Sequence, residues 1–114
     1  MASQYEDAGK NVMLDALGVV GVYASLHIVN GDEVSGGDPA YARKAITYAA
    51  ASGGSMAANG TLPVFDVPAC TVAFVCIYSA STAGTKYATI EVTNEVFAAQ
   101  GTYTVSAGTL DLNA

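Results

Sequence analysis

Charged side chains are scarce in this 114-residue chain. Only 12% of its residues are Asp, Glu, Lys or Arg, about half of the usual share of roughly 25%. Hydrophobic residues make up 52%, which excludes an intrinsically disordered chain and leaves an unusually large uncharged surface. Four basic residues against ten acidic ones give a net charge of −6. That sign excludes proteins that bind by neutralising the phosphates of nucleic acids or anionic lipids.

The chain also lacks tryptophan and any long hydrophobic run. Its longest apolar stretches, residues 19–23 and 72–78, are far shorter than the roughly 20 residues that span a bilayer. Residues 1–7 are polar and acidic, whereas a secretory signal begins with a basic segment followed by an apolar one. We therefore expect a protein made in the cytoplasm, with no membrane span and no export signal.

The length predicts a single domain over residues 1–114, because a chain of this size supports one hydrophobic core. From Gln4 to Leu17, apolar residues recur at three- and four-residue spacing, which predicts an amphipathic helix over about residues 4–17. Ser3 is the expected N-cap, and Gly18 is the expected stop.

Strand patterns fill the remainder, over about residues 19–112. Residues 19–29 alternate, with Leu26 on the core face and His27 on the polar face. Residues 42–51 fit a helix or a strand, and their β-branched and aromatic residues favour a strand. Residues 71–78 are apolar on both faces, which predicts a central, covered strand with Phe74 in the core.

The other segments complete the predicted fold. Loops are expected at 30–39, 52–60 and 79–85, a segment at a sheet edge at 61–68, and strands at 86–92, 102–106 and 109–112. Short strands separated by glycine-containing turns predict a mainly β fold, an antiparallel β-sandwich or jelly roll with one N-terminal helix.

Few side chains suggest chemistry, and no catalytic, cofactor-binding or metal-binding residue is predicted. Cys70 and Cys76, six residues apart in one strand, are too distant to bridge each other. We interpret them as small buried hydrophobic residues, with an intersubunit disulfide or a metal site as less favoured alternatives. His27 is interpreted as a surface or rim histidine, although catalysis by a Cys–His pair stays open because its members can be distant in sequence.

Two further groups leave alternatives open. Asp32, Glu33 and Asp38 share one loop, which favours a solvated acidic loop over a calcium site because the spacing matches no EF-hand. Seven tyrosines allow stacking on sugar rings. Three of them, Tyr23, Tyr48 and Tyr78, lie inside strand patterns, which favours a structural role.

The most specific pattern is the order of residues from Glu33 to Ser55. It contains the block Tyr41 to Ser55 and is followed much later by Gly101 to Leu112. This pattern resembles a family of small virion proteins of tailed bacteriophages, found mainly among phages of actinobacteria and known as tail-fibre or minor structural proteins. The resemblance implies a structural role on the virion and supplies no catalytic residues.

The expected function is therefore that of a non-enzymatic virion structural protein. It is expected either at the tail or fibre or as a decoration (cement) subunit on the capsid. A low-charge surface suits a subunit that packs against neighbours, so we expect a homo-oligomer, with a trimer as the expected order, bound to phage capsid or tail proteins. The alternative from another class is a host-surface glycan-binding module, and a hydrolase is a weaker one.

Overall fold

The computed structural model describes residues 4–60, 62–105 and 109–111. Within them, one helix, α1 (Asp7–Val20), is followed by nine strands. These are β1 (Tyr23–Ile28), β2 (Lys44–Ala45), β3 (Thr47–Tyr48), β4 (Ser55–Asn59), β5 (Val64–Val67), β6 (Cys70–Tyr78), β7 (Lys86–Phe97), β8 (Gly101–Thr104) and β9 (Thr109–Asp111). Every strand pair is antiparallel. The predicted mainly β, antiparallel fold with one N-terminal helix is confirmed.

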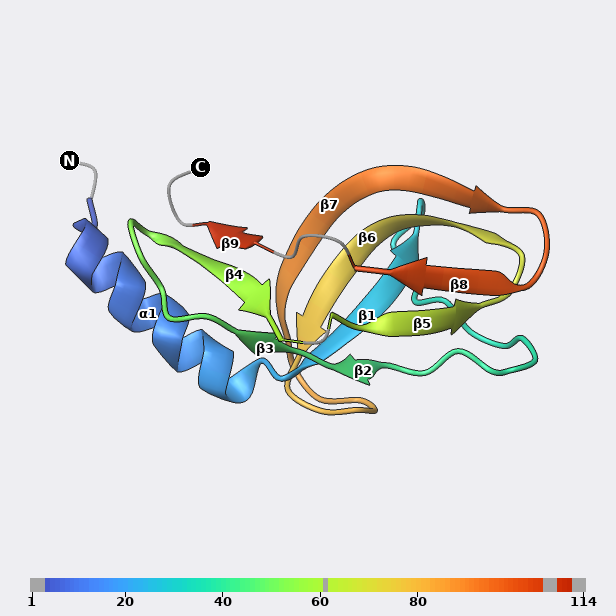
Figure 1. The fold of residues 1–114 in the computed structure, drawn as a ribbon, viewed down its shortest axis with the longest axis horizontal. Helices are drawn as coiled ribbons and strands as arrows, with labels where there is room; N and C mark the ends of the chain where they lie inside the picture. The colour runs from blue at the N-terminus through green and yellow to red at the C-terminus, as the bar shows by residue number, and fades with distance from the viewer. Residues whose placement is uncertain (1–3, 61, 106–108, 112–114) are drawn as a thin grey trace.

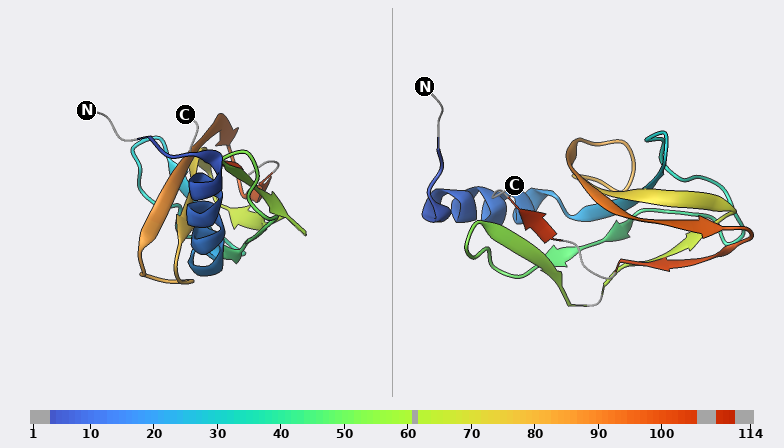
Figure 2. Two further views of the ribbon diagram at one scale, coloured as in Figure 1. Left: turned by 90° about the vertical axis from the view of Figure 1, so that its left-hand side faces the viewer. Right: turned by 90° about the horizontal axis from the view of Figure 1, so that it is seen from above.

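The molecule is elongated, with extents of 47 × 28 × 24 Å. One sheet has the strand order β2-β1-β6-β7, a second has the order β3-β4-β9, and β5 pairs with β8. The β5–β8 pair lies as a second layer against the four-stranded sheet (Figure 2). Helix α1 and the β3-β4-β9 sheet form the opposite end of the molecule (Figure 1). The layers are those of a small β-sandwich extended at one end by the helix.

The core lies between these layers. Ala24 and Leu26 of β1 pair with Ile77 and Val75 of β6, and none of the four is more than 1% exposed. Phe65 of β5 belongs to the same cluster and is fully buried. The cluster extends through all layers and also contains Leu14, Val34, Ile46, Met56, Val67, Val72, Val105 and Leu110.

Strand β6 is central, as predicted, because it pairs with β1 on one side and β7 on the other. The predicted position of Phe74 in the core is wrong. The register shifts between Val72 and Phe74, and Phe74 pairs with His27 and Glu91 on the face opposite the core. The bulge lets Val72 and Val75 face the core and leaves Phe74 half-buried on the other side.

The helix differs from its prediction at both ends. It begins at Asp7, with Glu6 as the N-cap, and Ser3 lies outside the described residues. It continues through Gly18 to Val20 and ends at Gly21, whose N–H donates to the Leu17 carbonyl. A Cβ on Gly21 would lie 2.7 Å from a methyl group of Ile77, so glycine is required where the chain passes the core.

Other predicted boundaries also move. Residues 19–22 precede β1, and residues 42–51 contain two short strands, β2 and β3. The predicted loop at 52–60 is wrong, because it contains β4, which pairs with β3 and β9 and buries Met56. Strand β7 is longer than predicted. The predicted positions of Thr61, Ser106 and Leu112 lie outside the described residues.

Candidate functional site

His27 and Ser25 lie on the face of β1 opposite the core, because side chains alternate along a strand. The sequence separated these two faces correctly, but the predicted surface position of His27 is wrong. Its side chain is 4% exposed, and that of Ser25 is fully buried. Loop residue Gly31 and the ring of Tyr78 cover the imidazole, with the two ring centroids 6.2 Å apart. Gly31 follows after the end of β1 and Tyr78 lies in another strand, so the alternation of β1 gave no sign of this cover.

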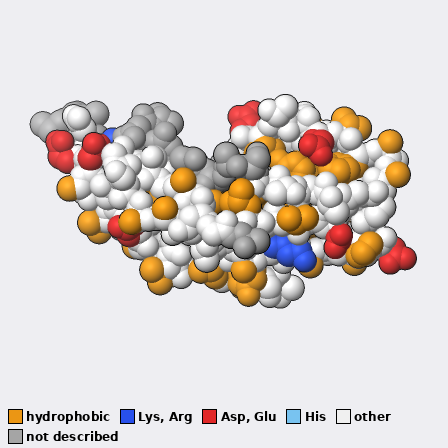
Figure 3. Space-filling view, viewed as in Figure 1, with side chains coloured by type: hydrophobic (Ala, Val, Ile, Leu, Met, Phe, Trp, Pro, Cys, Tyr) orange, Lys and Arg blue, Asp and Glu red, His pale blue; other side chains and the backbone are white. Residues whose placement is uncertain are grey.

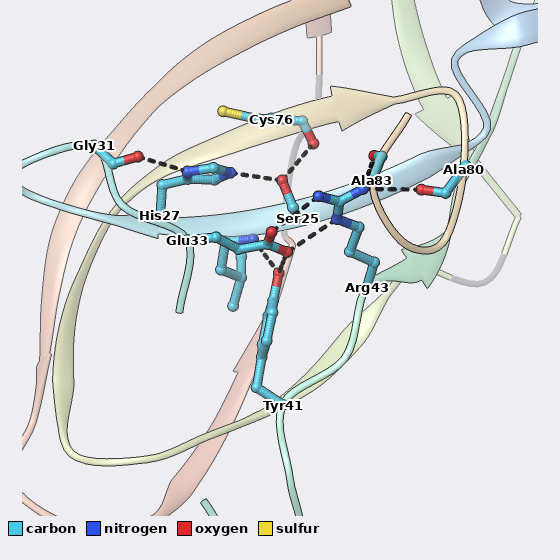
Figure 4. Close-up of polar contacts among 10 residues, drawn as sticks. Ser25, His27, Gly31, Glu33, Tyr41, Arg43, Cys76, Ala80 and Ala83 are labelled. Carbon is cyan, nitrogen blue, oxygen red and sulfur yellow. Dashed lines mark hydrogen bonds and ion pairs between the residues drawn. The ribbon is translucent and has the colours of Figure 1, made fainter. Parts of the chain in front are cut away.

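The imidazole belongs to a chain of buried hydrogen bonds (Figure 4). Its Nδ1 lies 2.8 Å from the carbonyl oxygen of Gly31 and therefore donates, since a carbonyl only accepts. Its Nε2 lies 2.8 Å from the hydroxyl oxygen of Ser25, and this hydroxyl lies 3.4 Å from the carbonyl oxygen of Cys76. When the ring is neutral, the Ser25 hydroxyl donates to Nε2. When the ring is protonated, Nε2 donates to Ser25, and the hydroxyl hydrogen can turn to Cys76. Both protonation states are satisfied.

An arginine clamp lies beside this chain (Figure 4). The Nε and Nη2 atoms of Arg43 donate to the two carboxylate oxygens of Glu33 over 3.0 and 2.9 Å. The Nη1 atom donates to the carbonyl oxygens of Ala80 and Ala83 over 3.1 and 2.7 Å. The guanidinium carbon also lies 3.7 Å from the centroid of the Tyr78 ring. Arg43 therefore fastens the 79–85 loop to the edge of the four-stranded sheet.

Tyr41 completes the clamp from the loop before β2. Its hydroxyl donates to Glu33 over 2.8 Å and accepts the backbone N–H of Leu26 over 2.9 Å. The prediction that Glu33 is a free, solvated acid is wrong, because its partners come from other segments. Asp32 and Asp38 are exposed, as predicted.

These contacts change the acidities of the buried groups. The neighbouring Cys76 side chain and the Gly31 carbonyl raise the pKa of His27 above its ordinary value, although burial acts in the opposite direction. Burial raises the pKa of Cys76, but the neighbouring His27 and Thr89 side chains outweigh it and lower the pKa overall. Burial opposes ionisation of Glu33 too, yet hydrogen bonds from Arg43 and Tyr41 keep its pKa below the ordinary value.

The distance between the Ser25 hydroxyl oxygen and Nε2 of His27 is one that also separates a nucleophile from its general base. Catalysis needs a substrate to reach the hydroxyl, and Ser25 has no exposed surface. A cleft of about 330 Å³ lies beside the clamp, lined by Glu33, Arg43 and the 81–83 loop, without Ser25, His27 or Cys76. Each guanidinium nitrogen of Arg43 already donates to a protein acceptor. The cluster is therefore arranged to hold segments together.

The cysteines and the acidic groups give no metal centre. Both Cys70 and Cys76 are free, which confirms that they do not bridge each other. Across residues 4–60, 62–105 and 109–111, no three His, Cys, Asp or Glu side chains gather as a metal site would require.

The tyrosines do not form one stacking surface for a sugar. Tyr23, Tyr48 and Tyr78 are half-buried, as predicted. The Tyr48 hydroxyl is buried without a hydrogen-bond partner, and burial raises its pKa to about 12. Tyr5 and Tyr87 are the most exposed tyrosines. Tyr5 precedes α1, whereas Tyr87 lies in β7, in a different part of the fold.

The most unusual surface is on α1. Leu14 is the only residue of α1 that is fully buried. Val12 and Val19 are 69% and 76% exposed, and Asp15 and Asn11 instead point toward the body, where they accept the backbone N–H groups of Ala51 and Gly54. Hydrophobic side chains are visible at this end of the molecule in Figure 3. Local spacing predicted an amphipathic helix but not which of its faces would dock.

No helix in the described part of the chain is long and apolar enough to cross a membrane. Comparison with protein-family models, with curated proteins and with solved structures gives no match. The most distinctive features of the structure are the exposed side of α1 and the buried polar cluster around His27 and Arg43.

Protonation of His27 is expected to stabilise the fold. Because its folded pKa is raised, the contribution is fully present below the unfolded value of about 6.5 and is lost as the pH rises through the folded pKa. Denaturant unfolding between pH 5 and pH 8 should show the wild type losing stability relative to His27→Gln over this interval.

The other titratable groups that act on His27 are Cys76 and Glu33. Only the histidine has an ordinary pKa inside that window. Ser25→Ala, which removes the acceptor of the protonated Nε2, should weaken the pH dependence. A free-energy difference between wild type and His27→Gln that stays constant from pH 5 to pH 8 would contradict this role.

Proposed function

We propose that the protein is a non-enzymatic structural subunit of a bacteriophage particle, either associated with the tail or fibre or decorating the capsid. The observation that carries the proposal is the exposed apolar side of α1. Val12, Val19 and Val20 are 69%, 76% and 45% exposed on one helix. A contiguous apolar surface on a soluble chain is typical of a surface that another protein covers.

The charge distribution supports a protein partner for this surface. Glu6, Asp7 and Asp15 are acidic and Lys10 is the only basic residue of α1. Such a helix has no polybasic face for anionic lipid or for nucleic acid. Removing the apolar side from water would contribute roughly 25 cal/mol for each Å² buried.

The polar cluster supports a non-enzymatic role. Ser25, His27 and Cys76 are at most 4% exposed, and their hydrogen bonds are made within the protein. The placement on a virion rests on the resemblance of residues 33–55 and 101–112 to small virion proteins of tailed phages. A low content of charge, 12%, agrees with a subunit that has much of its surface covered.

The test is binding to phage particles that lack the protein. Purified protein mixed with such particles should cosediment with them and saturate at a fixed number of copies per particle. The matched control is Val12→Glu, which places a charge on the exposed side of α1 without touching the core, and it should bind much less. Wild-type protein that stays in the supernatant would refute the proposal.

The same preparation distinguishes the glycan-binding alternative. Cell-wall polysaccharide of the host is added in place of the particles. Cosedimentation with the polysaccharide, without any binding to particles, would replace the structural role by glycan binding.

A further inference from the structure

The exposed residues of α1 repeat with the spacing of a helix–helix contact. Gly9, Val12, Ala16 and Val19 are separated by three, four and three residues, which is the a/d spacing of a coiled coil. We call these four residues the α1 seam. All four are exposed.

The seam points directly away from the body of the protein. Leu14, the one fully buried residue of α1, follows Val12 by two residues and is therefore about 200° away around the helix. Figure 2 shows α1 standing in front of the remaining elements when the molecule is seen along its long axis. A second helix can therefore approach the seam without meeting the sheets.

We propose that the α1 seam pairs with the α1 seam of a second copy of this chain. The seam is identical on every copy, and its small a-position residues, Gly9 and Ala16, allow two helix backbones to approach closely. This inference deepens the proposed function, on which it rests, by naming the contact between neighbouring subunits.

The charges beside the seam are compatible with self-pairing. Glu6 and Asp15 occupy the e and g positions that flank it, if Gly9 is position a. In a parallel pair, Asp15 lies next to Val20 of the neighbouring copy. In an antiparallel pair centred on Val12, it lies next to Ala8. Asp15 therefore meets no acidic residue of the neighbouring copy in either helix orientation.

The size of the surface predicts how strong the contact is. With Met13 and Val20, which are 39% and 45% exposed, the seam presents an apolar patch on the order of 400 Å². This is about half of the roughly 800 Å² that each partner buries in a standard interface. Self-association of the free chain is therefore reversible, and a high local density of copies on a particle favours it.

Sedimentation velocity over a concentration series tests the contact. The wild type should shift from monomer to oligomer as the concentration rises into the range of tens to hundreds of micromolar. Val12→Glu and Val19→Glu should remain monomeric, with unchanged circular dichroism, since both positions are exposed and glutamate is a good helix former.

The matched control is Val96→Glu. Val96 is 74% exposed and is the second-last residue of β7, the strand whose arrowhead points away from α1, toward the opposite end of the molecule (Figure 1). This variant should associate as the wild type does. If Val96→Glu also abolishes association, the contact is head-to-tail between the two ends and seam pairing is wrong. A wild type that is monomeric throughout also overturns it.

Disulfide trapping locates the contact. Val12→Cys, at the centre of the seam, should give a covalent dimer under mild oxidation, whereas Thr93→Cys on β7 should give none above the background from Cys70 and Cys76. Equal amounts of covalent dimer from the two variants would contradict pairing through the seam. Wild-type protein that binds particles but stays monomeric, with no covalent dimer of Val12→Cys, would overturn the seam and leave the particle role standing.

Discussion

Replacing Phe65 by alanine is expected to destabilise the protein by about 3–5 kcal/mol, as large-to-small changes at packed aromatic residues do. Phe65 is fully buried in the cluster between the two layers. Its ring stacks on Tyr41, with centroids 6.1 Å apart, so the change leaves a cavity and loosens the residue that anchors Glu33. Urea unfolding followed by circular dichroism measures the loss.

The matched comparison is Phe74→Ala. Phe74 was predicted from the sequence to lie in the core, but the structure places it half-buried on the opposite face of β6. Its replacement should cost only about 1–2 kcal/mol. Equal costs at Phe65 and Phe74 would contradict the division of the sheet into a core face and an outer face.

Arg43→Ala is expected to cost about 2–4 kcal/mol, because it leaves a partly buried carboxylate without its partner. The Arg43 side chain is 8% exposed and that of Glu33 is 29% exposed. The figure is below that of a fully buried pair because water reaches Glu33. The carbonyl groups of Ala80 and Ala83 lose their donor as well. Denaturant unfolding gives the cost, and hydrogen exchange should become faster in the 79–85 loop.

Two controls separate charge from geometry in the clamp. Arg43→Lys keeps the positive charge but not the planar fork that spans both oxygens of Glu33, so it should recover only part of the stability. In the double variant with Glu33→Gln, the cost of removing Arg43 should shrink, because no buried carboxylate is left behind. An Arg43→Ala protein with wild-type stability would show that the clamp is not needed.

The clamp also explains why a chain with so little charge keeps an ion pair partly inside. Arg43 reaches three segments at once: the 30–39 loop through Glu33, the 79–85 loop through two carbonyls, and β6 through the Tyr78 ring. A hydrophobic side chain could not satisfy those carbonyl groups. The segments that it joins are far apart in sequence, so spacing alone could not reveal them.

The sequence by itself determined the fold class and the type of most elements. The alternation of residues 23–28, the apolar run at 71–78 and the helical spacing before Gly21 each express a local rule, because side chains repeat every two residues in a strand and about every 3.6 in a helix. The same rules failed at β4, where Ser55 and Asn59 carry little strand signal. That strand exists because β3 and β9 pair with it on either side.

Only the tertiary structure decided which faces are covered. Alternation placed Ser25 and His27 together on the polar face of β1, and the structure buries both side chains. The predicted helix ended at residue 17, and its periodicity did not show that Val12 and Val19 would both be exposed on α1. The face of β1 with Ser25 and His27 is covered by Tyr78 and the turn at Gly31. The side of α1 with Val12 is left open because the helix docks through its other side, with Leu14, Asn11 and Asp15. Burial depends on contacts between residues distant in sequence, and a local period carries no information about them.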